Sequence, residues 1–241
     1  MGSSRRTVFP PQPPMSETDA ASIRANDWAA FRELSQLMNH WTLEAWPPGR
    51  RSGFYWYLTF DDADLATSVK HCQDHLGAEG LDPVPLDGLH LTMLGIGDTD
   101  RLPTVHVEEI VERSRAALRD FGAFEIVIGP LGGSRSAIRF SVTPWDRLIA
   151  LHRILRDSAR EVTADRALRP TIDFRPHLGI GYCNTDRPAS TVIDRVRELR
   201  ALPPVTVSVG CVKLVELWPE EGRYCWRDHA VVALAPDPRV R

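Results

Sequence analysis

The sequence has few cysteines, no long apolar run and no secretory signal. Its four cysteines, Cys72, Cys183, Cys211 and Cys225, show no CxxC spacing. We therefore expect reduced thiols rather than a disulfide framework or a zinc motif. No apolar stretch is long enough to cross a bilayer, and the N-terminus lacks the apolar centre of a signal peptide. These absences predict a cytoplasmic protein with no membrane partner.

An excess of positive charge is also absent. The chain carries 29 Lys and Arg against 32 Asp and Glu, which gives a formal net charge of -3 at pH 7. Proteins that bind duplex DNA normally carry more Lys and Arg than Asp and Glu, because positive charge displaces the counterions of the DNA. We therefore expect no duplex DNA partner. A small phosphate ligand remains compatible with this charge. The sequence holds no P-loop, no dinucleotide fingerprint and no serine- or cysteine-nucleophile signature.

Three parts of unequal size are predicted along the 241 residues. Residues 1–16 are rich in proline and poor in apolar surface, so we expect a disordered arm. Residues 17–49 are predicted as an accessory N-terminal helix, from about Asp19 to Trp41, followed by a Pro-Pro-Gly turn. Residues 50–241 are predicted to form the main domain.

Within the main domain, strands and helices alternate. Helical spacing of apolar residues predicts helices, and runs of β-branched and aromatic residues predict strands. The predicted helices cover about 63–76, 107–121, 144–162 and 192–199, and the predicted strands cover 54–60, 89–95, 124–128, 137–142, 176–181, 205–217 and 224–234. The order of strand, helix, histidine-bearing strand and helix occurs in both halves. We therefore predict an α+β, bilobal and pseudo-symmetric fold, with antiparallel sheets and flanking helices around a central groove.

Two of the predicted strands carry a histidine where a groove would lie. Side chains at i and i+2 share one face of a strand, so His90 and Thr92 would project into the same cleft while Leu89, Leu91 and Met93 face a core. A second strand begins at His177, 87 residues later. Two imidazoles that face a common space form the arrangement that metal-free acid/base catalysis requires.

These motifs resemble the two-histidine phosphoesterase superfamily, and within it the branch of 2'-5' RNA ligases and cyclic phosphodiesterases. The resemblance covers about residues 53–235. It is carried by four phrases in this sequence: Gly88-Leu89-His90-Leu91-Thr92, Ala137-Ile138-Arg139-Phe140-Ser141-Val142, Phe174-Arg175-Pro176-His177 and Leu214-Val215-Glu216-Leu217.

The resemblance implies a metal-independent phosphodiesterase. It would open a 2',3'-cyclic phosphate, or a related phosphodiester, on a nucleotide or RNA end or on a small metabolite, without a cofactor. The reverse 2'-5' RNA ligation is a related activity that the resemblance also implies. We expect the chain to act as a monomer.

The same resemblance assigns roles to individual residues. His90 and His177 would carry the proton transfers, with their acid and base roles left open, and Thr92 would bind the phosphate. The family pattern has a second hydroxyl two residues after the second histidine, where this chain has Gly179. The backbone N–H of Gly179 or a water would then serve the phosphate instead, or the ligand would be bulkier. Arg139 is either an added phosphate ligand, through its bidentate guanidinium, or a surface arginine.

Two tyrosines are candidates for contact with a nucleobase. Tyr57 and Tyr182 could flank a base by stacking, or they could be partly buried core residues.

Two alternative functions remain open. Because Gly179 removes a hydroxyl, a degenerate module that binds a nucleotide or RNA end without turnover is one alternative. A metal hydrolase is the other, because His71 and His75 have the spacing of metal ligands on a helix; no third ligand is apparent, and a solvated helix face explains them more simply.

Overall fold

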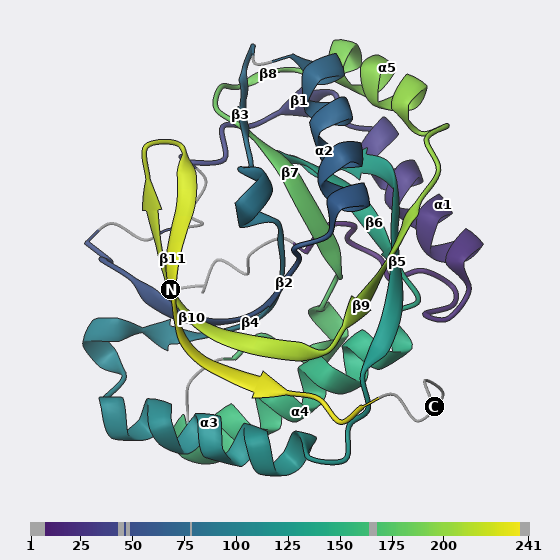
Figure 1. Ribbon diagram of the computed structural model, residues 1–241. Coiled ribbons are helices and arrows are strands. Elements are labelled where there is room, and N and C mark those ends of the chain that lie inside the picture. Colours follow the sequence, from purple (N-terminus) through teal and green to yellow (C-terminus); the bar gives the residue numbers. More distant parts are fainter. Residues whose placement is uncertain (1–7, 43–45, 47–48, 78, 164–167, 237–241) are drawn as a thin grey trace.

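The computed structural model describes residues 8–42, 46, 49–77, 79–163 and 168–236 (Figure 1). Within these residues the α-helices are α1 (Ala20–Arg32), α2 (Ala63–Leu76), α3 (Thr104–Leu118), α4 (Asp146–Thr163) and α5 (Ser190–Leu199), and the short 3₁₀ turns are η1 (Leu86–Gly88), η2 (Thr99–Arg101) and η3 (Thr171–Asp173). None of the helices in the described part of the chain is both long enough and apolar enough to span a membrane.

The described strands form three sheets, in which every pair of neighbours is antiparallel. A four-stranded sheet has the order β11-β10-β2-β4, a five-stranded sheet has the order β3-β7-β6-β5-β9, and a small sheet pairs β1 with β8. The strands are β1 (Gln36–Leu37), β2 (Gly53–Thr59), β3 (Leu81–Pro83), β4 (His90–Asp98), β5 (Phe124–Gly133), β6 (Ala137–Thr143), β7 (His177–Cys183), β8 (Arg187–Pro188), β9 (Val205–Val209), β10 (Cys211–Glu220) and β11 (Arg223–Ala233).

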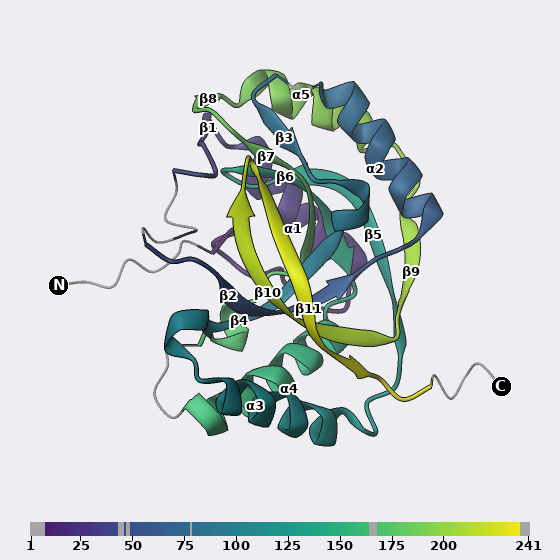
Figure 2. The same ribbon diagram turned by 60° about the vertical axis from the view of Figure 1, so that its left-hand side comes forward.

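Helices cover the outer faces of the two large sheets, so their inner faces look toward each other. Helices α3 and α4 pack against the four-stranded sheet, and α2 and α5 lie over the five-stranded sheet (Figures 1 and 2). Strands β4 and β7, which begin at His90 and His177, contact each other where the two sheets meet. The predicted α+β fold with antiparallel sheets and flanking helices is confirmed.

The two lobes are interleaved in sequence, which differs from the simple succession of halves that the repeat suggested. The C-terminal strands β10 and β11 complete the sheet that holds β2 and β4, and the early strand β3 joins the sheet that holds β7. The single strand predicted over 205–217 is broken at Gly210, so that β9 and β10 belong to different sheets. This crossover ties the two lobes together.

The accessory helix is shorter than its apolar pattern predicted. Helix α1 ends at Arg32 rather than near Trp41. Beyond it, the backbone N–H groups of Met38 and His40 donate to the carbonyls of Arg135 and Cys183. These bonds to the five-stranded lobe replace helical bonds, because an edge of another element satisfies the backbone equally well and also buries Leu37.

Residues 8–16 of the predicted disordered arm pack against the domain, whereas residues 1–7 lie outside the described part of the chain. The carbonyl of Phe9 accepts a hydrogen bond from Arg139, and the carbonyl of Pro10 accepts one from Arg175. Pro10 is buried. Two guanidinium groups therefore hold this segment in place, which a composition rule for disorder cannot detect.

Candidate active site

His90 stands at the start of β4 with a fixed ring orientation. Its Nδ1 is 2.8 Å from the carbonyl oxygen of Gly88, at the end of η1. Because a carbonyl only accepts, this bond places the proton of the neutral ring on Nδ1 and leaves a lone pair on Nε2. The ring stacks on Tyr57 at 4.3 Å between centroids and has Trp226 against its edge. The side chain is thus locked before any ligand arrives.

His177 repeats this arrangement at the start of β7. Its Nδ1 is 2.7 Å from the carbonyl oxygen of Arg175, again two residues earlier and just after a 3₁₀ turn. The structure gives Nε2 of neither histidine a hydrogen-bond partner within the described residues, and neither atom is sealed from solvent, in contrast to Nε2 of His152. Each strand therefore presents one free imidazole nitrogen.

The two histidines lie close enough to influence each other. Burial lowers the pKa of His90 from 6.5 to about 4, and the Gly88 carbonyl opposes part of that effect. For His177, burial and then the positive charge of Arg139 lower the pKa to about 3, a value that also includes a smaller lowering by His90 and an opposing effect of the Arg175 carbonyl. Both rings are therefore neutral at pH 7 in the free protein, and an anion between them would favour protonation of either one.

Thr92 shares one face of β4 with His90, as the alternation of the strand predicts. It stands two residues after His90, its side-chain hydroxyl forms a hydrogen bond with Tyr57, and it pairs across the strands with Tyr57. The Tyr57 ring is only 1% exposed, because His90 and Trp226 cover it. Little of that ring is left to stack a base.

Gly179 occupies the matching position after His177. It pairs with Arg139 on β6, next to the pair of His177 with Ser141. A β-carbon at position 179 would lie 3.7 Å from the hydroxyl oxygen of Tyr182 and would clash with nothing. Steric crowding therefore does not explain why position 179 lacks a side-chain hydroxyl.

Arg139 is buried among partners of its own. Its Nε donates to the carbonyl of Gly133, its Nη2 donates to the carbonyl of Phe9, and Nη2 is also 3.7 Å from the carboxylate of Asp27. Its side chain is 4% exposed. A phosphate would have to displace these groups to reach the guanidinium, but the charge already acts on His177, whose pKa it lowers.

Tyr182 belongs to an aromatic cluster in which His40 is a member that the sequence analysis missed. Tyr182 is 9% exposed, and its ring lies 4.4 Å from His40 and 5.4 Å from Trp41, centroid to centroid. His40 bonds Ser136 through Nδ1 and Tyr224 through Nε2, and burial lowers its pKa to about 4. No local signal marks His40, because its partners are 96 and 184 residues away.

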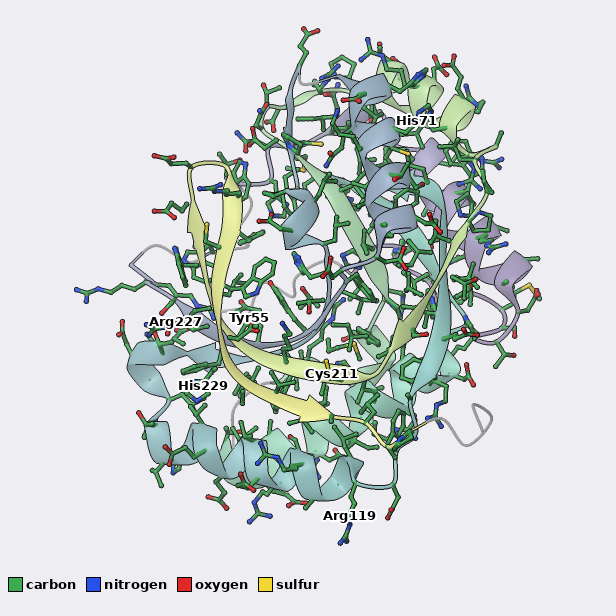
Figure 3. All side chains as sticks on the ribbon, viewed as in Figure 1. Tyr55, His71, Arg119, Cys211, Arg227 and His229 are labelled. Atoms are coloured by element: carbon green, nitrogen blue, oxygen red, sulfur yellow. The ribbon has the colours of Figure 1, made fainter. Side chains whose placement is uncertain are left out.

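The metal alternative gains no support from the geometry. His71 lies on α2, outside the five-stranded sheet, and His75 pairs with Glu198 on α5 (Figure 3). Across the described residues, no group of three or more His, Cys, Asp and Glu side chains is placed to hold a metal ion. His71 and His75 therefore lie on the outer helix α2, away from the strands that carry His90 and His177.

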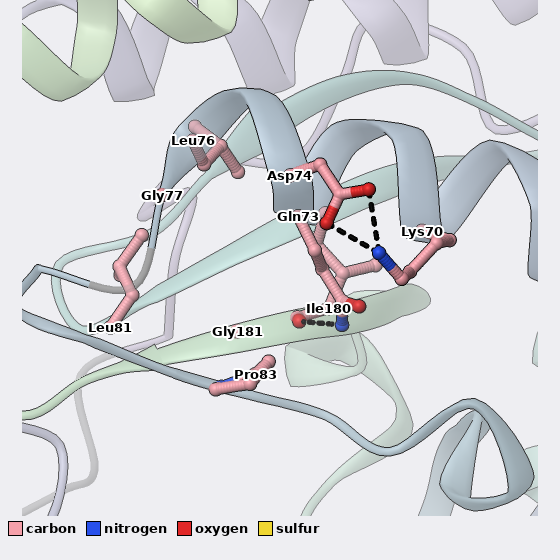
Figure 4. Close-up of a pocket in the computed structure, with 9 residues that line it drawn as sticks. All are labelled: Lys70, Gln73, Asp74, Leu76, Gly77, Leu81, Pro83, Ile180 and Gly181. Atoms are coloured by element: carbon pink, nitrogen blue, oxygen red, sulfur yellow. Dashed lines mark hydrogen bonds and ion pairs between the residues drawn. The ribbon is translucent and has the colours of Figure 1, made fainter.

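A separate cavity lies behind β7, on the side that α2 covers (Figure 4). Its volume is about 350 Å³, and its lining comes from α2, β3 and β7. Gln73 crosses it and donates through Nε2 to the carbonyls of Val84 and Ile180. This cavity does not contain the two histidines; it lies behind the strand that carries His177.

Comparison with known proteins gives a family and a set of similar folds. The family model of the 2'-5' RNA ligase superfamily matches residues 61–217. Among curated proteins no match is found.

Solved structures similar to this chain include a phosphoesterase, Escherichia coli LigT complexed with 3'-AMP and a protein from Thermus thermophilus. The phosphoesterase has a TM-score of 0.58 at 19% identity, LigT 0.57 at 18%, and the Thermus protein 0.58 at 16%; each match covers 77% of this chain and 99% of the other. At this identity the likeness shows the fold.

The family model covers more than half of the chain and contains both histidine strands. The protein therefore belongs to the 2'-5' RNA ligase superfamily of two-histidine phosphoesterases.

Proposed function

We propose that this protein is a metal-independent phosphodiesterase that opens a 2',3'-cyclic phosphate on a nucleotide or an RNA end. One observation carries the proposal: His90 and His177 each donate from Nδ1 to a carbonyl two residues earlier, and each leaves Nε2 without a partner among the described residues, on two strands that contact each other. Paired imidazoles of this kind can exchange protons with a phosphodiester held between them.

The reaction uses the two rings in opposite protonation states. One neutral histidine takes a proton from water through Nε2, and the water oxygen forms a bond to phosphorus. The bond from phosphorus to one ribose oxygen breaks, and that oxygen receives a proton from Nε2 of the other histidine, which is protonated. The rings end with exchanged protonation states and return by proton exchange with solvent. Each transfer contributes about 10²–10⁴ in rate.

Groups near the two imidazole rings stabilise the negative charge of the bound phosphate. Thr92 is the side-chain donor on β4, and the backbone of β7 passes at Gly179. Arg139 contributes a buried positive charge behind His177. Escherichia coli LigT has been solved with 3'-AMP, with phosphate and with ATP, which supports a nucleotide as the ligand class here.

The experiment is a panel of 2',3'-cyclic nucleotides and of RNA ends with a cyclic phosphate or a 2'-5' junction, with products identified by mass. We expect the wild-type protein to add one water to at least one cyclic substrate in the presence of a chelator. Both His90→Ala and His177→Ala are expected to lose this activity by about 10³-fold or more. Undiminished turnover in either variant would refute the assignment.

A second candidate is a binding module without turnover, which the absence of a hydroxyl at Gly179 favours. It predicts that a nucleoside monophosphate binds the wild-type protein and that no substrate of the panel gains mass. His71→Ala and His75→Ala serve as matched controls, because these histidines lie on α2 outside the groove, and they are expected to leave turnover unchanged.

A further inference from the structure

The groove contains the family's side-chain hydroxyl on one histidine strand only. Thr92 supplies it on β4, two residues after His90, whereas Gly179 holds the same position on β7. A phosphate between the two rings would then have a hydroxyl donor on one side and none at the matching position on the other. The surroundings of Gly179 show which group stands in that space.

A β-bulge on β7 changes which residues face the groove. Arg139 pairs with Gly179, but the preceding residue of β6, Ile138, pairs with Gly181, so Ile180 is left without a partner on β6. One extra residue reverses the alternation of the strand beyond it. Residue 182 therefore returns to the face of His177 and Gly179, although simple alternation would place it on the opposite face.

Gln73 on α2 holds this bulge from behind. Its Nε2 donates to the carbonyl oxygen of Ile180 at 2.9 Å and to that of Val84 at 2.8 Å (Figure 4). The carbonyl of Ile180 thus accepts from this side chain in addition to the backbone N–H of Val84. The bulge is a fixed feature of the strand, since Ile180 is also fully buried.

The bulge brings the Tyr182 hydroxyl to the space beside Gly179. Its oxygen would lie 3.7 Å from a β-carbon at position 179, which is van der Waals contact. The ring is held by His40, Trp41 and Tyr224, so it has little freedom to move. Within the described residues the hydroxyl has no hydrogen-bond partner and is not sealed from solvent. Burial raises its pKa well above the ordinary value, which keeps it protonated and able to donate.

The two histidine strands show a reciprocal exchange of residues. Both have a bulge three residues beyond the histidine, at Met93 on β4 and at Ile180 on β7. On β4 the position after the bulge that matches Tyr182 is Gly95, where a β-carbon would lie only 2.8 Å from the ring of Tyr55. The strand with the threonine thus has glycine at the later position, and the strand with the tyrosine has glycine at the earlier one.

We propose that the hydroxyl of Tyr182 donates to a non-bridging phosphate oxygen in place of the hydroxyl absent at Gly179, making Tyr182 a phosphate ligand and not a stacking platform for a base. The inference rests on the proposed function, because it concerns the same phosphate between His90 and His177. It adds a residue from the far side of a bulge to the catalytic groove.

The test compares Tyr182→Phe with the wild-type protein on the best cyclic nucleotide of the panel. The variant removes one oxygen and keeps the ring, and we expect kcat to fall on the order of 10²-fold, as for removal of one oxyanion donor elsewhere. Tyr55→Phe is the matched control, since its hydroxyl accepts from Arg50 and from no described residue of the proposed site; its kcat is expected to stay within about twofold.

A rescue distinguishes phosphate binding from a structural role of the hydroxyl. Adding Gly179→Ser to Tyr182→Phe places a hydroxyl back in the same space, and we expect it to restore at least about tenfold of the lost kcat. An unchanged kcat in Tyr182→Phe, or a loss that Gly179→Ser does not restore, would overturn the inference.

Binding of inorganic phosphate keeps the two proposals separable. By calorimetry or NMR titration, Tyr182→Phe is expected to bind phosphate about tenfold more weakly than the wild type, since a hydrogen bond to a charged group is lost. If the wild type binds phosphate but turns over no substrate, the proposed function fails while this comparison still decides the inference. Equal phosphate affinity in the two proteins would contradict the inference even if the histidine variants are inactive.

Discussion

The pH dependence of turnover is expected to differ strongly from that of a site with two ordinary histidines. Burial lowers the pKa of His90 to about 4, and burial together with Arg139 lowers that of His177 to about 3. Catalysis needs one ring neutral and the other protonated. Above both pKa values the base is always ready, and the fraction of protonated acid falls tenfold with each pH unit.

The magnitude follows from these values. For kcat/KM, which reports the free enzyme, the profile should fall with a slope near −1, so that the value drops about 100-fold between pH 6 and pH 8. The profile of kcat should be flatter, because the bound phosphate anion raises the pKa of the acid in the complex. A cyclic phosphodiester remains a monoanion over this range, so the substrate adds no titration of its own.

The assay is initial-rate kinetics on a 2',3'-cyclic nucleotide between pH 6 and pH 9 at constant ionic strength, with circular dichroism to verify that the protein stays folded. A bell-shaped kcat/KM with its maximum near pH 7 would refute the reasoning. It would mean that the two rings titrate near the value of about 6.5 for exposed histidine, and that burial and Arg139 do not act on them as described.

Three further predictions concern the frame of the site, each measured by urea unfolding. Gln73→Leu should lower the free energy of unfolding by about 1–3 kcal/mol, because the carbonyl of Val84 loses its side-chain donor and that of Ile180 keeps only the backbone N–H of Val84; no change would show that the bulge is held without Gln73. The free energy of unfolding should fall as the pH drops from about 6.5 toward 4, because histidines protonate in the unfolded chain at a pH where the buried histidines of the folded protein stay neutral. Burial lowers the pKa of His152 to about 4, so His152→Gln should reduce the loss between pH 7 and pH 5 by about 2 kcal/mol; an equal loss in both proteins would contradict this assignment. Asp27→Ala should destabilise by about 3–5 kcal/mol, because Arg139 loses its buried carboxylate partner, and a change below about 1 kcal/mol would contradict the pairing.

Local sequence patterns were sufficient to predict the elements whose stabilising contacts lie within a short stretch of the chain. Helix α2 begins and ends where the apolar spacing over 63–76 predicted, and the Asp62 carboxylate caps its start by accepting from the N–H of Leu65. The predicted strand over 224–234 likewise corresponds to β11, which a turn at Glu221 and Gly222 joins to β10. The placement of His90 and Thr92 on one face followed from the period of a strand.

Other features depend on contacts between distant parts of the chain. The end of α1 at Arg32 is set by backbone bonds to the five-stranded lobe, and the swap of β10 into the first lobe's sheet has no local signature. The position of Tyr182 beside Gly179 depends on the bulge at Ile180, which inverts the alternation that a sequence pattern assumes. His40 is a member of the aromatic cluster only because the fold brings Tyr224 to it.

The most direct test of the account is a crystal structure of the protein with inorganic phosphate bound. We expect one phosphorus atom in the groove, with Nε2 of His90 and Nε2 of His177 each within hydrogen-bond distance, about 2.6–3.2 Å, of its oxygens. A phosphate that contacts only one of the two rings, or that binds elsewhere while both Nε2 atoms face water, would contradict the claim that the two histidines act on one phosphate.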